Sequence, residues 1–199
     1  MPFPDENRGV LLVAYRERWP GDFAALAAGL GRLRLADAGA IEHIGSTSIP
    51  GLLAKDVIDI QVRVASELDP AIAERFLEAG YRQRTEQWNH TEPTRTGPVP
   101  KLVFAPPAGE RPSNIHVRID GSSGARDALL FRDFLRADSQ ARDAWADLKR
   151  AIVTALPEID LPAYGQIKQP AWNVFMRAAD CWAEANRWHP WPLVPWADL

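Results

Sequence analysis

The residues best suited to chemistry are a Gly-Ser pair and a lone aspartate in a later apolar run. Gly45 has no side chain, so the backbone there can approach a ligand closely, and Ser46 offers a hydroxyl and an amide. Asp59 is flanked by two isoleucines, where a carboxylate is costly to bury unless it is paired or binds a metal. The pattern is typical of a site in which a loop holds a nucleoside triphosphate and a strand carboxylate binds its Mg²⁺.

Two carboxylates on one strand face usually bind the metal ions of such a site, and this sequence offers one. The run from 57 to 64 alternates with a period of two, so Asp59, Gln61 and Arg63 share a face. Gln61 is neutral and a poor replacement for a bridging carboxylate, which speaks against chemistry with two metal ions. For Asp59 itself, the alternatives to a ligand are backbone amides and Arg63.

A histidine in a second strand-like run is the next candidate. His116 alternates with Asn114 and Arg118, and three polar residues on one face favour a cleft wall over a core. If this strand lies beside that of Asp59, a neutral imidazole could ligate a metal or act as a general base near pH 7. For His116, as for His43, the alternative is a hydrogen-bonded core histidine.

Basic residues could neutralise phosphate charge. No apolar setting explains Lys55, although a solvated lysine is its alternative. Arg132 and Arg136 lie one helical turn apart, where they could clamp an anion or form salt bridges with nearby aspartates. The predicted site has Asp59 and His116 as catalytic and metal-binding residues, and the following ligand-binding residues: Gly45, Ser46, Thr47, Lys55, Arg132, His43, Arg118 and Lys168.

Strands and helices must bring these residues together. Periodicity predicts strands over 10–15, 41–44, 57–64, 101–104 and 114–119, and helices over 22–35, 70–79, 125–137, 139–155 and 168–186. Residues 84–100 have no period and are predicted to form a long loop, a kind of segment that tends to be functional or disordered. The order lacks regular βαβ alternation, so we expect an α+β fold with a small mixed sheet and helices packed mainly on one side.

Length and composition predict one domain over 1–199. Its 199 residues, 46% hydrophobic and 25% charged, have the composition of a globular protein. Five of the eight tryptophans lie near the C-terminal end: Trp172, Trp182, Trp188, Trp191 and Trp196. We expect the Trp- and Pro-rich tail at 187–199 to pack on the domain, with a homodimer contact as the alternative.

Charge, cysteine content and hydropathy narrow the classes of partner. The 23 Lys and Arg residues against 26 Asp and Glu residues give a net charge of −3, which gives no indication of nucleic-acid binding. The lone Cys181 can form neither an internal disulfide nor a zinc site built on a cysteine pair. Because no apolar stretch reaches the roughly 20 residues of a membrane helix and no signal-peptide core is visible, we expect a cytoplasmic protein without a membrane partner.

The segment EHIGSTSIPGLLAK at 42–55, followed by Ile58-Asp59-Ile60, resembles the GrpB family of the nucleotidyltransferase-like superfamily. The resemblance continues at 114–117, 131–136 and 148–149 and covers most of 10–180. It implies a minimal nucleotidyltransferase fold. Because the family also occurs fused to dephospho-CoA kinase, it further implies a link to nucleotide or coenzyme A metabolism. Asp56 departs from the family pattern, in which proline commonly follows the lysine, and we expect its charge to weaken phosphate binding at Lys55.

The residues and the resemblance give two functional hypotheses. In the first, the protein transfers a nucleotidyl or phosphoryl group from a nucleoside triphosphate with Mg²⁺ to a small acceptor, mainly by positioning and charge neutralisation. In the second, which Gln61 favours, it is a non-catalytic nucleotide- or coenzyme-A-binding module that supports a kinase or another metabolic enzyme. Both hypotheses make a phosphorylated small molecule the ligand.

Overall fold

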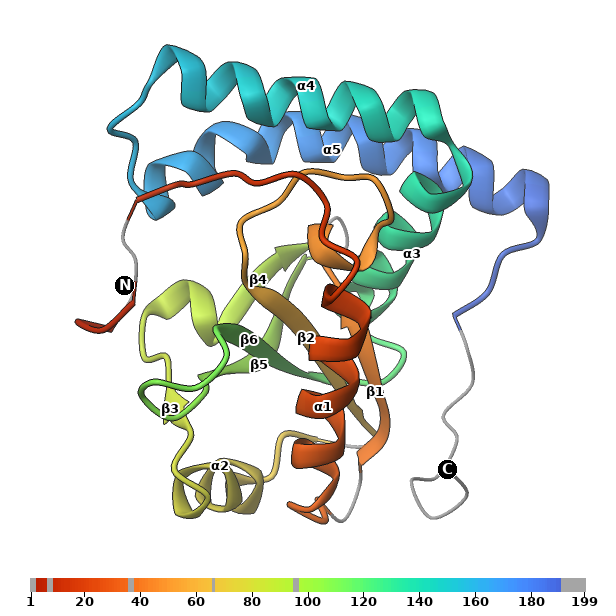
Figure 1. Cartoon of the computed structure of the whole chain (residues 1–199). Coiled ribbons are helices and arrows are strands. Elements are labelled where there is room, and N and C mark those ends of the chain that lie inside the picture. Colours follow the sequence, from red (N-terminus) through yellow and green to blue (C-terminus); the bar gives the residue numbers. More distant parts are fainter. Residues whose placement is uncertain (1–2, 7–8, 36–37, 66, 95–96, 191–199) are drawn as a thin grey trace.

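The computed structural model describes residues 3–6, 9–35, 38–65, 67–94 and 97–190 (Figure 1). Its α-helices are α1 (Trp19–Gly31), α2 (Pro70–Glu78), α3 (Ser123–Ala137), α4 (Ser139–Ala155) and α5 (Leu161–Asn186). Its strands are β1 (Ala38–Ile44), β2 (Ile58–Val64), β3 (Arg82–Gln83), β4 (Thr91–Thr94), β5 (Gly97–Ala105) and β6 (Ser113–Ile119). Two 3-10 helices, η1 (Ser46–Ser48) and η2 (Gln87–Asn89), precede β2 and β4. None of the helices in these ranges is long and apolar enough to cross a membrane.

The strands form a mixed sheet in the order β1-β2-β6-β5-β3, and β4 pairs with β5 outside this path. β2 and β6 run parallel, whereas the other pairs are antiparallel. Their register places Asp59 beside Asn114 and Gln61 beside His116. The α+β class with a small mixed sheet is therefore confirmed, and the strands of Asp59 and His116 are neighbours.

The two faces of β2 have different surroundings. Ile58, Ile60 and Val62 are fully buried in a core to which α1 contributes Trp19 and α2 contributes Phe76. Burying an apolar side chain of this size contributes about 1.5–3 kcal/mol. The polar face of β2 lies against α3, whose backbone accepts a hydrogen bond from Gln61. Helices α1 and α2 therefore pack on the apolar face of β2, and α3 provides a partner for its buried polar side chains.

Helices α3, α4 and α5 build a second apolar core. It contains Leu130 of α3, Trp145 of α4 and Met176 of α5, and Figure 1 shows α4 and α5 lying side by side across one end of the sheet. Trp188 also packs here and donates a 3.0 Å hydrogen bond from its indole to Asp133 Oδ2. The rest of the predicted tail packing concerns residues 191–199, which lie outside the described residues.

The predicted strand at 10–15 and the predicted loop at 84–100 are wrong. Only Val13 in the first segment pairs, through two hydrogen bonds of 2.9 and 3.0 Å with Ala54, because the segment runs along the loop before β2 rather than along a sheet edge. The second segment contains η2, β4 and the start of β5. Its prolines hid the alternation, since proline lacks an N–H and is confined to edge strands such as β4.

Two helix boundaries also differ from the expected ones. α5 begins at Leu161 instead of 168, because the Asp160 side chain accepts a hydrogen bond from the Ala163 amide and Pro162 fits the first turn. Pro170 inside this helix concealed its continuity. α1 spans Trp19–Gly31 instead of 22–35, and its first turn also contains a proline. The N-terminal signals of both helices are therefore visible in the sequence.

Candidate functional site

The Gly45–Ser48 loop follows β1 and lies directly against Asp59. Gly45 has a φ of 67°, a left-handed conformation that favours glycine, and a Cβ there would lie 2.9 Å from Asp59 Cβ. The space that glycine leaves is therefore filled by the Asp59 side chain of this chain rather than left open for a ligand. Ser48 closes the turn by donating a 2.6 Å hydrogen bond from its hydroxyl to the Gly45 carbonyl.

Cationic side chains of α3 and α4 hold this loop. Arg132 donates to the His43 carbonyl at 3.1 Å, and Arg136 donates twice to the Ser48 carbonyl, at 2.7 and 3.0 Å. Lys149 donates to Ser46 Oγ at 3.1 Å and also to the Leu53 carbonyl. Arg132 also forms an ion pair with Asp133 at 2.7 Å, which is the salt bridge expected as the alternative to an anion clamp. The arginine pair thus binds carbonyls of its own chain, and its role is to position the loop.

His43 and Thr47 are buried inside the loop's base. His43 Nε2 lies 3.0 Å from Thr47 Oγ1, and its ring stacks on Phe23 with centroids 4.8 Å apart. Burial, together with the charges of Arg136 and Arg132, lowers the pKa of His43 to about 4. The imidazole is therefore neutral at physiological pH and links β1, η1 and α1, which matches the core alternative for this histidine.

Asp59 lies at the meeting point of the loop, β2 and β6. Its Oδ1 accepts a 2.9 Å hydrogen bond from Asn114 Nδ2 and lies 4.0 Å from His116 Nε2. Burial and the charges of Arg118 and Lys101 hold the pKa of His116 well below its usual range, so the ring is neutral. His116 Nδ1 is buried without a hydrogen-bond partner in the described residues, which leaves it available to a ligand or water.

The charge of this carboxylate acts on three lysines. Lys55 precedes β2, Lys149 is on α4 and Lys168 is on α5. Burial, followed by the repulsion of Lys168 and Lys55, lowers the pKa of Lys149 to about 7. Burial and the charge of Lys55 lower the pKa of Lys168 to about 8. The charge of Asp59 acts in the opposite direction on the pKa values of all three lysines. The site therefore combines three cations that repel one another with two acids, since the charge of Glu6 also acts on Lys55.

The other polar residues of β2 are engaged in a separate hydrogen-bond network. Gln61 accepts a 2.9 Å hydrogen bond from Arg118 and donates to Glu42 at 3.1 Å. Arg118 also binds both carboxylate oxygens of Glu92, at 2.6 and 2.8 Å. Burial alone would raise the pKa of Glu92, but Arg118 and the nearby Lys101 overcome it and hold this pKa at about 2. Arg118 is therefore neutralised within the fold, and Gln61 is not aimed at a ligand beside Asp59.

The residues around Asp59 do not form a protein-held magnesium centre. Mg²⁺ prefers octahedral oxygen ligands, usually carboxylates together with substrate phosphates. Among the described residues, no group of three or more His, Cys, Asp or Glu side chains is placed to hold a metal ion. Asp59 would be the single carboxylate ligand, and its charge already acts on three lysines. We therefore derive no chemical step through Mg²⁺.

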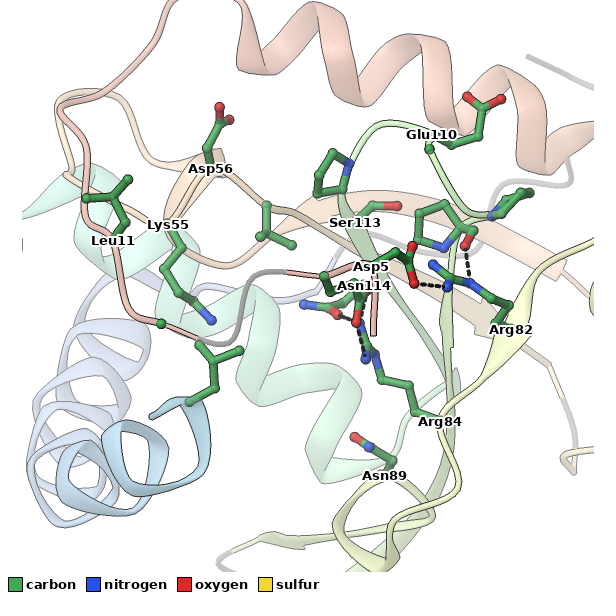
Figure 2. A pocket seen from close by; sticks show the side chains of 18 of the residues that line it. Asp5, Leu11, Lys55, Asp56, Arg82, Arg84, Asn89, Glu110, Ser113 and Asn114 are labelled. Carbon is green, nitrogen blue, oxygen red and sulfur yellow. Dashed lines mark hydrogen bonds and ion pairs between the residues drawn. The ribbon is translucent and has the colours of Figure 1, made fainter. Parts of the chain in front are cut away.

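A cavity of about 730 Å³ opens beside Lys55. Lys55 and Arg84 extend into it from opposite sides, with Asn114 between them (Figure 2). Arg84 binds Asn114 Oδ1 at 3.0 Å and both oxygens of Glu6, at 2.7 and 2.9 Å. A second cavity of about 580 Å³ contains Lys168, and the two cavities share Trp88, Leu161 and Pro162 in their walls.

The charge of Asp56 is neutralised within the fold, and its expected effect on phosphate binding at Lys55 stays a prediction. Its carboxylate accepts hydrogen bonds from Arg16 at 2.5 Å, Arg18 at 2.8 Å and the Trp19 indole at 2.8 Å, and it also pairs with Arg111. These donors overcome the effect of burial and hold the pKa of Asp56 below its ordinary value. Asp56 thus joins α1 to the start of β2.

Several residues of the site were missed from the sequence. Lys149 falls within the apolar stripe of α4, and a buried lysine among apolar neighbours is itself a signal of a polar partner. Arg84 and Glu92 lie in the segment wrongly predicted as a loop, and nothing local indicates their partners. Glu6 comes from the N-terminal segment, far along the chain from Arg84.

The chain is similar to known proteins over nearly its whole length. The sequence model described as GrpB protein matches residues 9–178. A dephospho-CoA kinase of Mycolicibacterium paratuberculosis is 33% identical over 204 residues, covering 91% of this chain and 48% of that protein. A UPF0157 protein of Streptomyces coelicolor is 39% identical over 131 residues, covering 64% of this chain and 62% of that protein.

A solved structure shows the same fold. The crystal structure of conserved protein GrpB from Enterococcus faecalis matches with a TM-score of 0.69 at 24% identity, covering 85% of this chain and 96% of that one. The chain spans about half the length of the dephospho-CoA kinases it matches, between 41% and 48%. From the match over residues 9–178, we conclude that this chain belongs to the GrpB family.

Proposed function

We propose that this chain binds a phosphorylated small molecule of the nucleotide or coenzyme A type beside Asp59. The observation that carries the proposal is that Lys55 and Lys168 line two cavities with shared walls and that their charges lower the pKa of Lys149, while Asp59 and Glu6 offset these cations only in part. Buried cations that repel one another are unfavourable in the free protein, and a bound polyanion relieves that repulsion. The phosphates of the ligand would thus supply negative charge that the side chains around these lysines do not fully provide.

The roles of the cations follow from their exposure and bonds. Lys55 and Lys168 line the two cavities and are the residues that contact phosphate oxygens. Lys149 is 2% exposed and donates a hydrogen bond to Ser46. It therefore positions the loop and adds positive charge to the site without contacting the ligand. The charge of Asp59 offsets part of the positive charge of these lysines.

The relatives support the class of ligand. Those named dephospho-CoA kinase match this chain over about half of their own length, so in them the matched region accompanies further sequence. A domain that binds nucleotide or coenzyme A is a natural companion of a kinase with that name. We therefore propose a binding module that supports a metabolic enzyme, in which Gln61 serves the fold rather than a metal.

Nucleotidyl transfer is the second candidate, and the pair of Asp59 and His116 favours it. The two side chains lie 4.0 Å apart, and the ring of His116 is neutral, which is the form that a general base needs, although its lowered pKa makes it a weak base. An acceptor hydroxyl would attack the α-phosphorus and give its proton to His116, while the bond to pyrophosphate breaks. This reaction needs the lysines to neutralise the charge of the leaving pyrophosphate.

Calorimetry with tripolyphosphate, ATP and coenzyme A, each with EDTA and then with Mg²⁺, tests the proposal. We expect binding in EDTA, and at 100 times the dissociation constant a stabilisation of about 2.7 kcal/mol against unfolding. Lys55→Ala and Lys168→Ala should each weaken binding about tenfold or more, a loss of about 1.4 kcal/mol. Arg150→Ala, at an exposed cation of α4, is the matched control.

Two outcomes decide between the candidates. No binding of any of the three ligands in EDTA overturns the proposed function. Release of pyrophosphate from ATP by the wild type, lost in Asp59→Asn with binding retained, establishes the transferase instead. Binding without turnover in both proteins supports the module.

A further inference from the structure

Trp88 is a large aromatic side chain left exposed at the junction of the two cavities. It belongs to η2, is 55% exposed, and lines both the cavity of Lys55 and the cavity of Lys168. Most tryptophans of a folded protein are largely buried, because their area makes exposure costly. An exposed indole at the mouth of a concave site therefore points to an aromatic partner.

From this position we infer that Trp88 is the stacking platform for the nucleobase of the ligand, with the base lodged in the second cavity. This inference deepens the proposed function and rests on it, since the phosphates would bind Lys55 and Lys168 next to the platform. The class of ligand is thereby narrowed from any polyphosphate to one that carries a planar heteroaromatic ring.

The walls of the second cavity suit such a ring. Trp145 and Trp172 line it together with Trp88, and a volume of about 580 Å³ is ample for a base with its sugar. Gln166 and Gln169 line the same cavity and are exposed on α5. Their amides offer both donors and acceptors to the polar edge of a base, which aromatic walls alone cannot bind.

Lys168 is the lysine of this cavity that we expect to bind the phosphate nearest the base. Lys168 Nζ lies 4.5 Å from the ring centroid of Tyr164 and 5.9 Å from that of Trp145. Aromatic faces orient the ammonium without neutralising it, so its charge is still available to an anion. A base on Trp88 and phosphates on Lys168 and Lys55 therefore occupy adjoining parts of one continuous site.

An apolar peptide is a poorer occupant for this cavity. Lys101 in its wall is paired with Glu92 at 3.2 Å, but a purely apolar ligand would bury Lys168 without an anionic partner. A nucleotide combines the ring that the tryptophans favour with the negative charge that Lys168 favours. Base stacking on an aromatic side chain changes affinity by about ten- to a hundredfold per base when the side chain is replaced by alanine.

The test compares ATP with tripolyphosphate, which has the same phosphates and no base, on wild type, Trp88→Ala and Trp88→Phe. We expect ATP to bind the wild type at least about tenfold more tightly than tripolyphosphate. Trp88→Ala should remove that advantage and leave the affinity for tripolyphosphate within about twofold, and Trp88→Phe should restore most of it. Val174→Ala, an exposed apolar residue on α5 outside both cavities, controls for loss of apolar surface.

A spectroscopic readout separates stacking from a merely structural role. In a nitrogen–proton spectrum, ATP should shift the indole signal that is absent from Trp88→Phe, whereas tripolyphosphate should leave it in place. If tripolyphosphate binds but ATP binds no better, or if Trp88→Ala weakens both ligands equally, the inference is overturned and the proposed function stands. If neither ligand binds the wild type, the proposed function itself fails.

Discussion

Lys149 Nζ donates a 3.1 Å hydrogen bond to Ser46 Oγ, although the lysine comes from α4 and the serine from the loop after β1. The same ammonium binds the carbonyl of Leu53. One buried lysine therefore ties together both ends of the segment that connects β1 with β2, and its protonation state affects both the loop and the candidate binding site.

The stability of the protein should increase with pH between about 7 and 10. The pKa of Lys149 is lowered from 10.5 to about 7 in the folded state, so the unfolded chain binds more protons in this range. The cost of burying the charge is fully present below pH 7 and is relieved as the pH rises through the folded pKa. Between pH 7 and pH 9, the free energy of unfolding measured in urea should increase more for the wild type than for Lys149→Met. Equal increases in the two proteins would contradict the shifted pKa.

Gly45→Ala should destabilise the fold by about 2–3 kcal/mol, since alanine is strained at this φ and its Cβ would press on the side chain of Asp59. The control is Gly21→Ala in α1, where a Cβ meets no atom within 4 Å, and we expect a change below about 1 kcal/mol. Urea midpoints measure both. Similar losses for the two variants would show that the contact with Asp59 is unimportant.

Arg118→Met should destabilise the protein by about 3–5 kcal/mol, because it leaves the carboxylate of Glu92 buried and without its main partner. The side chains of this pair are only 8% and 14% exposed. Arg150→Met breaks an exposed pair with Asp147 and should cost less than about 1 kcal/mol. The free energies of unfolding in urea compare the two, and a small loss for Arg118→Met would mean that the network around Gln61 is dispensable.

Glu6→Gln should increase the affinity for tripolyphosphate several-fold. The Glu6 carboxylate occupies the guanidinium of Arg84 inside the larger cavity, where it both blocks a cation and repels an incoming anion. The amide keeps the size of the side chain and removes the charge. Asp5→Asn, which releases the more peripheral Arg82, is the control and should have a smaller effect. Weaker binding by Glu6→Gln than by the wild type would refute this role.

Alternation along single strands predicted much of the sheet and part of the site. It placed Asp59, Gln61 and Arg63 on one face, and it placed His116 opposite them once the strands were neighbours. These features are local, because the pleat alone decides which face a side chain takes. The helices of the second core followed in the same way from apolar periodicity, apart from the first turns of α5, which begins at Leu161 rather than at 168.

The partners of charged residues could not be predicted in this way. A guanidinium on α3 binds whichever acceptor the fold brings near, and for Arg132 and Arg136 these acceptors are carbonyls of a distant loop. Glu92 lies in a proline-rich segment whose strands form only through pairing with β5. The lysine cluster likewise joins residues from before β2, from α4 and from α5, which only the tertiary structure brings together.

The arginines of α3 and the lysine of α4 also determine how the Gly45–Ser48 loop responds to a ligand. Their bonds to His43, Ser46 and Ser48 hold the loop in one shape before any ligand arrives. A loop held in this way would lose little conformational entropy if a ligand bound to it. If the proposed ligand reaches this loop, it would therefore meet a surface whose shape is already set in the free protein.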